Sequence, residues 1–237
     1  MKAVIIAAGE GRRLRPLTLE KPKPLIVIAG KPLIQHIWEI LPEEIDEVIL
    51  VVGYKSEMIQ AFIGNEFLGK RVTYVMQKEP WGTGHALKIC QKYLENDKKF
   101  LLLYADDLQS KQGIKNLLQF DSALLVYPVT DPTHFGVVVL RENGTILDIE
   151  EKPANPKSNL AVTGVYVLAP KIFSFYKKEL EGRGEYYLTD LIKSYIQNFE
   201  CHAVESDFWI PIGYPEDLAR AEKILNELST RGKNAIL

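Results

Sequence analysis

The sequence predicts an α/β fold with a mixed, mostly parallel sheet flanked by helices, and three observations support this prediction. Short apolar runs without polar alternation recur in the first half of the chain, which is typical of strands covered on both faces. Segments with helical spacing of apolar residues separate these runs, and this alternation favours parallel strands joined by right-handed crossovers. Glycine, proline and acidic residues follow several runs directly, so the strand ends carry the polar chemistry.

Each expected element comes from such a run or from helical spacing of apolar residues. Strands are expected at residues 3–7, 47–53, 71–76, 99–104, 123–129, 161–167 and 201–205. Helices are expected at residues 31–41, 56–62, 83–94, 113–120 and 216–228, with another beginning near Tyr187 or Thr189. Asn143-Gly144 is a typical hairpin turn, and the chain is expected to fray from Ser229 onward.

Bulk composition limits the class of protein. A chain of 237 residues can bury a large core, and we expect one domain spanning residues 1–237. Lysine and arginine number 29 against 31 aspartate and glutamate residues, a balance that argues against a nucleic-acid partner. We expect no signal peptide, because Met1-Lys2 runs directly into the first strand. We expect no membrane segment, because no apolar run approaches the length of a membrane span. Cys90 and Cys201 lack metal spacing, and a reducing, cytoplasmic location is expected.

The first strand ends in a glycine-rich turn followed by cations. Gly9 and Gly11 would let backbone amides approach a ligand closely. Four cations follow: Arg12, Arg13, Arg15 and Lys23. We expect them to gather at the carboxyl ends of the strands, where open α/β sheets bind ligands. The simplest interpretation is a polyphosphate site.

Two common phosphate motifs do not fit the chain. A dinucleotide-binding fingerprint needs a third glycine opening a helix, but Leu14 stands in that place and Pro16 follows it. A P-loop is approached only at residues 64–71, which lack the required hydroxyl and precede a strand. An NAD-binding dehydrogenase is therefore disfavoured.

A segment that could read a base follows the third strand. The carboxamide of Gln77 offers a donor and an acceptor side by side, matching the N3–H and O4 edge of uracil or thymine. Gly82 leaves room for a backbone contact, and Thr83 is expected to cap the next helix. His85 is expected to be structural rather than catalytic.

Two acidic clusters complete the candidate site. Asp106 and Asp107 end the fourth strand and suggest Mg²⁺ held together with substrate phosphates, with Asp107 expected to cap a turn. Glu151 could accept hydrogen bonds from sugar hydroxyls, and Lys152 could neutralise a sugar phosphate.

The run Gly9-x-Gly11-x-Arg13-Leu14-Arg15-Pro16-Leu17-Thr18, followed by Pro22-Lys23-Pro24-Leu25, resembles the signature of the sugar-1-phosphate nucleotidyltransferases. The motifs are closest to those of the uridylyl- and thymidylyltransferases, and the resemblance extends over nearly the whole chain. It implies a Rossmann-like fold with a nucleotide-binding half at residues 1–120 and a sugar-phosphate-binding half at residues 121–237. Arg12 departs from the threonine usual in the family.

The resemblance also implies a role for individual residues. Nucleotide contacts are expected from Ala8, Gly9, Gly11, Arg13, Gln77, Gly82 and Thr83. Sugar-phosphate contacts are expected from Tyr104, Gly136, Glu151, Lys152, Thr163 and Gly164. Catalysis is assigned to Arg13, Lys23 and Asp106, with Asp106 as the Mg²⁺ ligand. A buried strand aromatic is the alternative interpretation of Tyr104.

Two positions depart from the family pattern. Thr163 stands where asparagine is common, which leaves recognition of an N-acetyl group open. Pro211 stands where an aspartate often provides a second metal ligand, and proline cannot ligate a cation. Water, phosphate oxygens or a neighbour such as Asp207 would complete the metal shell, or metal binding is weaker.

The expected reaction joins a sugar-1-phosphate and a nucleoside triphosphate, giving a nucleotide sugar and pyrophosphate. UTP with glucose-1-phosphate or N-acetylglucosamine-1-phosphate is preferred, and thymidylyl transfer to glucose-1-phosphate is the alternative within the class. A catalytically weak regulatory subunit that binds a nucleotide sugar is the alternative from another class, motivated by Pro211 and Thr163. The sequence leaves homo-oligomerisation open.

Overall fold

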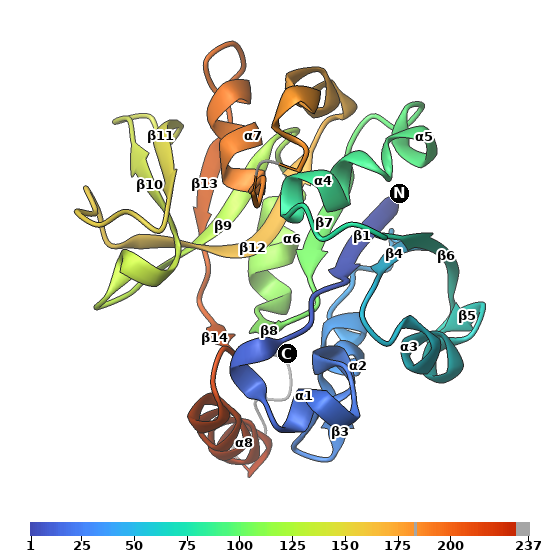
Figure 1. Ribbon diagram of the computed structural model, residues 1–237. Helices are drawn as coiled ribbons and strands as arrows, with labels where there is room; N and C mark the ends of the chain where they lie inside the picture. The colour runs from blue at the N-terminus through green and yellow to red at the C-terminus, as the bar shows by residue number, and fades with distance from the viewer. Residues whose placement is uncertain (183, 231–237) are drawn as a thin grey trace.

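A mixed sheet with a parallel centre organises the computed structural model, which describes residues 1–182 and 184–230 (Figure 1). The parallel strands are β1 (Lys2–Ala7), β4 (Glu47–Val52), β6 (Lys70–Met76) and β7 (Phe100–Tyr104). They lie in the order β7-β1-β4-β6, and the short β5 (Glu66–Phe67) pairs antiparallel with the outer edge of β6. Because the central strands run in one direction, their carboxyl ends open at a common edge.

Antiparallel strands extend the sheet beyond β7. They are β9 (Ala123–Pro128), β10 (Gly136–Leu140), β11 (Ile146–Glu151) and β12 (Leu160–Leu168). The long β12 pairs with β7, β9 and β10, and β11 forms a hairpin with β10. The last strand of this sheet, β13 (His202–Glu205), runs parallel to β9. The mixed sheet flanked by helices, predicted from the sequence, is therefore confirmed.

Helices cover both faces of the sheet (Figure 1). They are α1 (Leu17–Glu20), α2 (Leu33–Glu39), α3 (Ser56–Ile63), α4 (Thr83–Lys88), α5 (Gln91–Leu94), α6 (Lys111–Leu117), α7 (Leu188–Tyr195) and α8 (Pro215–Thr230). Ile5 of β1 belongs to the core cluster that includes buried side chains of α2, α3, α6 and α8. Its neighbour Val4 belongs to the cluster of α4, α5 and α7, as expected when successive side chains of a strand face opposite sides.

Some observed helices differ from the expected ones. The helix expected at residues 113–120 is α6 (Lys111–Leu117), which begins earlier because the Ser110 side chain caps it by accepting from the Gly113 N–H. The helix expected at residues 31–41 begins only at Leu33, because β3 (Lys31–Pro32) pairs with β2 (Val27–Ile28). The helix expected at residues 83–94 divides into α4 and α5, where the Cys90 N–H bonds the Leu87 carbonyl in a tighter turn. Fraying is expected from Ser229 onward, but α8 continues to Thr230, and residues 231–237 lie outside the described residues.

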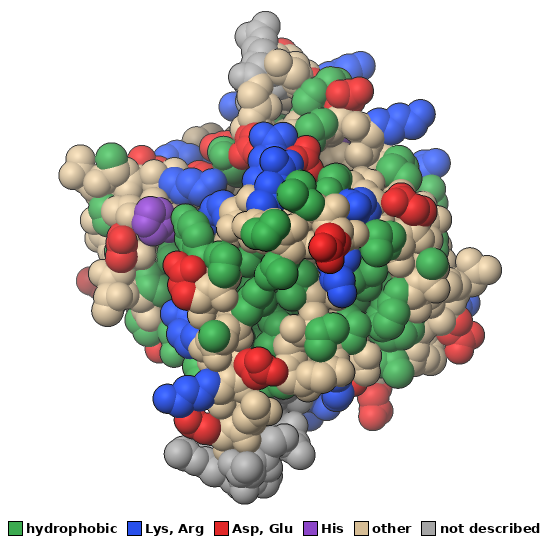
Figure 2. Space-filling view, turned by 60° about the horizontal axis from the view of Figure 1, so that its bottom comes forward, with side chains coloured by type: hydrophobic (Ala, Val, Ile, Leu, Met, Phe, Trp, Pro, Cys, Tyr) green, Lys and Arg blue, Asp and Glu red, His purple; other side chains and the backbone are tan. Residues whose placement is uncertain are grey.

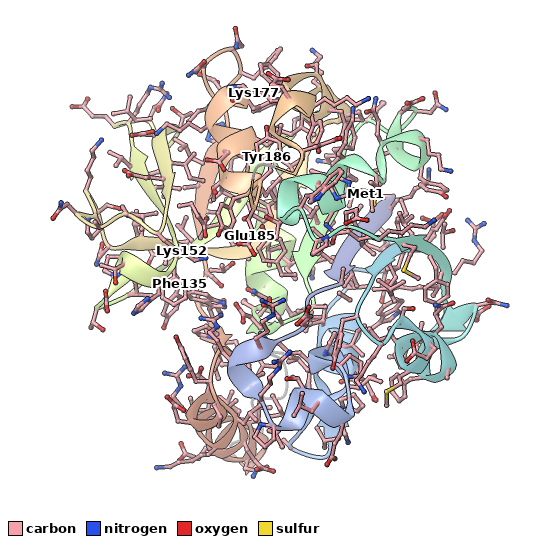
Figure 3. All side chains as sticks on the ribbon, viewed as in Figure 1. Met1, Phe135, Lys152, Lys177, Glu185 and Tyr186 are labelled. Carbon is pink, nitrogen blue, oxygen red and sulfur yellow. The ribbon has the colours of Figure 1, made fainter. Side chains whose placement is uncertain are left out.

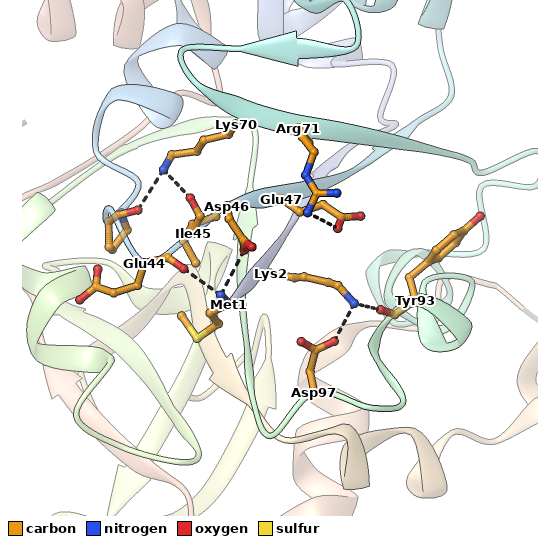
Figure 4. Close-up of polar contacts among 11 residues, drawn as sticks. Met1, Lys2, Glu44, Ile45, Asp46, Glu47, Lys70, Arg71, Tyr93 and Asp97 are labelled. Atoms are coloured by element: carbon orange, nitrogen blue, oxygen red, sulfur yellow. Dashed lines mark hydrogen bonds and ion pairs between the residues drawn. The ribbon is translucent and has the colours of Figure 1, made fainter.

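Polar contacts hold the amino ends of the central strands together (Figure 4). The Met1 amino group donates to the Glu44 carbonyl at 2.8 Å, and Lys2 Nζ lies 2.9 Å from Asp97 Oδ2. Lys70 Nζ donates to the Ile45 carbonyl at 2.6 Å. With this end of the sheet closed by its own contacts, the carboxyl end is the one available for a ligand. In the part of the chain that the structure describes, no helix has the length and hydropathy needed to cross a bilayer.

Candidate active site

A cavity of about 670 Å³ lies at the carboxyl ends of the central strands. Every residue that the sequence assigned to nucleotide, sugar phosphate, metal or catalysis lines it. Two walls enclose it: a loop wall formed by residues 8–25 and 77–83, and a strand wall formed by residues 135–136, 151–152 and 163–164. In the space-filling view, apolar side chains gather at the centre of the face shown, with charged side chains around them (Figure 2).

The loop wall is held in shape by contacts within the loop after β1. Leu14, in the 3-10 turn Arg12–Leu14, is buried in the core and anchors the turn. Gly11 has φ +62°, and a Cβ there would lie 3.0 Å from Thr18 Cγ2 and 3.1 Å from Lys23 Cβ. Thr18 Oγ1 in turn donates to the Gly11 carbonyl at 3.0 Å. Only glycine fits this position, because both the backbone conformation and the space exclude a side chain.

Three of the four expected cations reach the cavity. Arg12, Arg13 and Lys23 line it, whereas Arg15 does not. The Arg15 guanidinium pairs with Glu10 at 3.3 Å outside the cavity lining, so its expected place in the cluster is wrong. The Arg13 guanidinium lies over the Tyr214 ring, 5.0 Å from the ring centroid, in a cation–π contact.

The two adjacent carboxylates at the end of β7 have different surroundings. Asp106 Oδ2 pairs with Lys23 Nζ at 3.0 Å, with 43% of the Asp106 side chain exposed. Asp107 is engaged on both oxygens, accepting from the Ile212 N–H at 2.9 Å and from Trp209 Nε1 at 3.1 Å. Burial and the charge of Asp106 raise the pKa of Asp107 to about 7. Asp107 therefore ties β8 (Asp107–Gln109) to β14 (Trp209–Pro211), which is a larger structural role than the expected turn cap.

The site offers one partly exposed carboxylate for a cation, that of Asp106, which pairs with Lys23 in this structure. No group of three or more His, Cys, Asp or Glu side chains that could hold a metal occurs in residues 1–182 and 184–230. Pro211 lies opposite Asp107 in the β8–β14 pair. Asp207 does not line the cavity, because its carboxylate accepts a hydrogen bond from Ser110. One carboxylate fits Mg²⁺ when substrate phosphates and water supply the other oxygens.

The turn before α4 packs tightly against the segment before α7. Gly82 has φ +96°, and a Cβ there would lie 2.5 Å from the Tyr186 carbonyl oxygen. The Gly84 N–H donates to the same carbonyl at 2.8 Å. Thr83 does not cap its own helix, since its Oγ1 accepts from the Leu188 N–H at 2.9 Å and so supports α7. The expected cap is wrong, although Thr83 does line the cavity.

Glu151 and Lys152 stand at the end of β11 on the strand wall. Thr189 Oγ1 donates to Glu151 Oε2 at 2.9 Å, and burial raises the pKa of this carboxyl. Lys152 has φ +45°, its N–H donates to the Phe135 carbonyl at 2.9 Å, and its Nζ lies 4.8 Å from the centroid of the Tyr187 ring. Figure 3 labels Phe135 and Lys152 near the base of the β10–β11 hairpin.

Tyr104 packs against the β12 part of the strand wall. Gly164 has φ +85°, and a Cβ there would lie 2.7 Å from Tyr104 Cδ2, so the ring occupies the space of the missing side chain. Burial raises the pKa of Tyr104, and its hydroxyl lies 3.4 Å from that of Tyr166. Tyr104 is both a packed strand aromatic and a cavity residue. The Thr163 hydroxyl is buried and has no hydrogen-bond partner among the described residues.

The cavity also includes residues to which the sequence analysis gave no role in binding. They are His134, Phe135, Tyr187, Thr189, Tyr214, Asp217 and Arg220. Asp217 and Arg220 show why such residues are difficult to predict from the sequence. Asp217 Oδ2 accepts from the Gly213 and Tyr214 N–H groups at 2.8 Å, and Arg220 pairs with the other oxygen at 3.0 Å. Their i, i+3 spacing predicts an ion pair on a helix, but not that the helix starts at the cavity.

Known proteins resemble this chain over most of its length. Residues 2–227 match the nucleotidyl transferase family. The chain is 38% identical over 239 residues to the bifunctional protein GlmU of Methanocaldococcus jannaschii, covering 100% of this chain and 57% of that protein. It is 36% identical over 242 residues to the UTP–glucose-1-phosphate uridylyltransferase AglF of Haloferax volcanii, covering 98% and 99%. The chain therefore spans little more than half of the GlmU relative.

Two solved structures share the fold. One, described as a glucose-1-phosphate thymidylyltransferase from Bacillus anthracis, matches with a TM-score of 0.85 and 29% identity over 94% of both chains. The other, a UDP-glucose pyrophosphorylase complexed with UDP-glucose, matches with a TM-score of 0.84 and 25% identity, over 95% of this chain and 98% of the other.

Proposed function

Because the chain belongs to the nucleotidyl transferase family, we propose that it joins a sugar-1-phosphate to a nucleoside triphosphate, releasing pyrophosphate. A phosphate oxygen of the sugar attacks the α-phosphorus, and the bond from that phosphorus to the pyrophosphate oxygen breaks. The observation that carries the proposal is a single cavity with cations on both walls, Arg13 and Lys23 on one and Lys152 on the other. Two polyanions must meet in this reaction, so charge neutralisation and positioning dominate the barrier.

Each cation has a separate part in the proposal. Arg13 stabilises charge that develops on the triphosphate, and Lys23 lies near the α-phosphate. Lys152 holds the incoming sugar phosphate. The positive φ of Lys152 and the bond from its N–H to the Phe135 carbonyl support this part, because they hold the residue in one backbone conformation.

Mg²⁺ belongs to the proposal as the cation of the triphosphate. Asp106 would hold it, and when bound it would neutralise charge on the triphosphate oxygens. The ion pair between Asp106 and Lys23, 3.0 Å long, keeps the carboxylate at the cavity in the absence of a ligand. Asp107 has no part in binding the cation, because both its oxygens accept hydrogen bonds from the segment 209–212.

We infer UTP with glucose-1-phosphate or N-acetylglucosamine-1-phosphate as the substrates. AglF of Haloferax volcanii is named for UTP and glucose-1-phosphate and aligns with nearly the whole chain. Thymidylyl transfer is the second candidate, supported by the similarity to the Bacillus anthracis structure. Gln77 does not separate the two bases, because the thymine methyl group lies away from the edge that a carboxamide contacts.

The test is pyrophosphate release with Mg²⁺, using UTP and dTTP against glucose-, N-acetylglucosamine- and mannose-1-phosphate. One productive pair is expected, and it would identify both substrates. Arg13→Ala serves as the inactive control, because it removes a charge without touching the buried core. No release from any pair, while a nucleotide sugar still binds, would favour the regulatory subunit that Pro211 suggested.

A further inference from the structure

Gln77, at the end of β6, has a fixed amide orientation. Its Nε2 lies 3.0 Å from the Gly82 carbonyl oxygen and 3.2 Å from His85 Nδ1. A carbonyl oxygen only accepts hydrogen bonds, so the amide atom that faces Gly82 must be the NH₂ group. The contact with Gly82 therefore determines which end of the carboxamide is nitrogen.

The same contact determines the tautomer of His85. Because the Gln77 nitrogen is a donor, His85 Nδ1 at 3.2 Å must accept and cannot carry a proton. A neutral imidazole carries one proton, which must then be on Nε2. Trp81 packs on the imidazole with its ring centroid 5.0 Å away. His85 is held as a neutral imidazole with one defined tautomer.

Both amide hydrogens of Gln77 are therefore used inside the protein. The oxygen Oε1 makes no hydrogen bond with any other described residue, and Gln77 lines the cavity. The sequence analysis expected a donor and an acceptor for the base, but only the acceptor is left. An acceptor matches the N3–H of uracil or thymine, whereas cytosine presents a lone pair at N3.

We propose that His85 is a positioning residue for base selection: it holds the Gln77 carboxamide with its oxygen toward the cavity, so that the site accepts bases with an N3–H and rejects cytosine. This inference rests on the proposed function, since it assumes that a nucleotide occupies the cavity. His85 does not itself line the cavity, so it acts only through Gln77.

Protonation of His85 should break this arrangement. A proton on Nδ1 would face the NH₂ of Gln77, and two donors cannot share a hydrogen bond. Burial lowers the pKa of His85 below its usual value, while the charges of Glu79 and Glu181 act in the opposite direction. The neutral form is therefore the one present at neutral pH. Nucleotide affinity should fall as the pH drops through the pKa of His85.

The test is equilibrium binding of UTP, dTTP and CTP with Mg²⁺ and without sugar phosphate, followed between about pH 8 and pH 5. The variants are His85→Leu, which removes the acceptor, and His85→Asn, which keeps an acceptor oxygen but cannot titrate. His202→Asn is the matched control, because it removes an imidazole from β13, outside the cavity lining. Circular dichroism and thermal melting establish that each variant is folded.

The wild type should bind UTP and dTTP at least tenfold more tightly than CTP, as expected for one correctly oriented hydrogen bond. His85→Leu should lose about this factor in discrimination. His85→Asn should keep the discrimination and lose the fall in affinity at low pH. The triphosphate itself titrates in the same way with every variant. The difference in the pH dependence of nucleotide affinity between wild type and His85→Asn therefore reports the titration of His85.

The outcomes separate the inference from the proposed function. Unchanged discrimination in His85→Leu, with UTP bound normally, would overturn the role of His85 and leave the nucleotidyltransferase proposal standing. If His85→Leu does not fold, an identical pH profile in wild type and His85→Asn would overturn it in the same way. Binding of neither UTP nor dTTP by the wild type would overturn both.

Discussion

The two walls of the cavity are built in different ways. Within residues 8–25, the loop wall gains its shape from neighbours in sequence, as Gly11, Thr18 and Lys23 pack on one another. The strand wall depends on distant partners, since Gly164 packs on Tyr104 and Glu151 bonds Thr189. Local construction leaves a motif in the sequence, whereas long-range construction leaves only single residues whose purpose depends on the fold.

The most direct test of the loop wall is to replace its cationic side chains one at a time. Arg13→Ala should lower kcat by about 10²–10³, the usual loss when one charge-stabilising donor is removed. The measurement is steady-state pyrophosphate release, with denaturant unfolding to verify the fold. Arg15→Ala is the matched control from the same loop, since Arg15 pairs with Glu10 outside the cavity, and it should keep near-normal activity. Equal losses of kcat in Arg13→Ala and Arg15→Ala would contradict the distinction between a cation inside the cavity and one outside it.

The strand wall should be sensitive to a side chain added at Gly164. Gly164→Ala should lower the free energy of unfolding by about 1–3 kcal/mol or more, because it adds a Cβ at φ +85° and 2.7 Å from the Tyr104 ring. Gly144→Ala is the matched control, with φ +78° and nothing within 4 Å, so it should show only the cost of the backbone conformation. The two are compared by urea denaturation. If Gly164→Ala lowers the free energy of unfolding no more than Gly144→Ala does, the Tyr104 ring moves aside at little cost.

Asp107 ties β8 to β14 beside the cavity and should give the protein a pH-dependent stability. Its pKa is raised to about 7 by burial and by Asp106, so the folded state binds more protons than the unfolded chain. This contribution to stability is full below about pH 4 and is lost as the pH rises through about 7.

Asp107→Asn should remove that dependence. The free energy of unfolding of the wild type should fall by a few kcal/mol relative to the variant over this range, because one pKa unit corresponds to about 1.4 kcal/mol. The measurement is denaturant unfolding at a series of pH values. Asp121→Asn changes a fully exposed carboxylate and is the control. Parallel curves for wild type and Asp107→Asn would contradict the raised pKa.

The smallest effect is expected at Thr163. Its buried hydroxyl has no partner among the described residues, so Thr163→Val should leave the free protein equally stable or stabilise it by about 1 kcal/mol. If the hydroxyl contacts the sugar, the KM for the sugar-1-phosphate should rise by about 2- to 10-fold, with nucleotide affinity unchanged. Steady-state kinetics with each substrate varied in turn measures the effect on the KM for the sugar-1-phosphate and on that for the nucleotide separately. A gain in stability without a change in KM would remove Thr163 from the sugar site.

The positions of the central strands and the glycine- and cation-rich loop after β1 followed from the sequence. Continuous apolar runs located β1, β4 and β7 to within one residue at either end, because strands buried on both faces need such runs. Short elements such as β2, β5 and β14 were missed, since two or three residues carry no period. The break between α4 and α5 was missed for a similar reason. Helical spacing persists across it, and only the tertiary fold shows the turn.

What the sequence determined by itself is the chemistry at the strand ends: glycines, cations and carboxylates follow the strands that bring them to one edge. What the tertiary structure decided is the state of each group. Asp106 and Asp107 are neighbours in sequence, yet one faces the cavity and the other is engaged by Trp209 and Ile212, about a hundred residues away. Charge state and hydrogen-bond direction depend on burial and on such distant partners, and neither is a property of the local sequence.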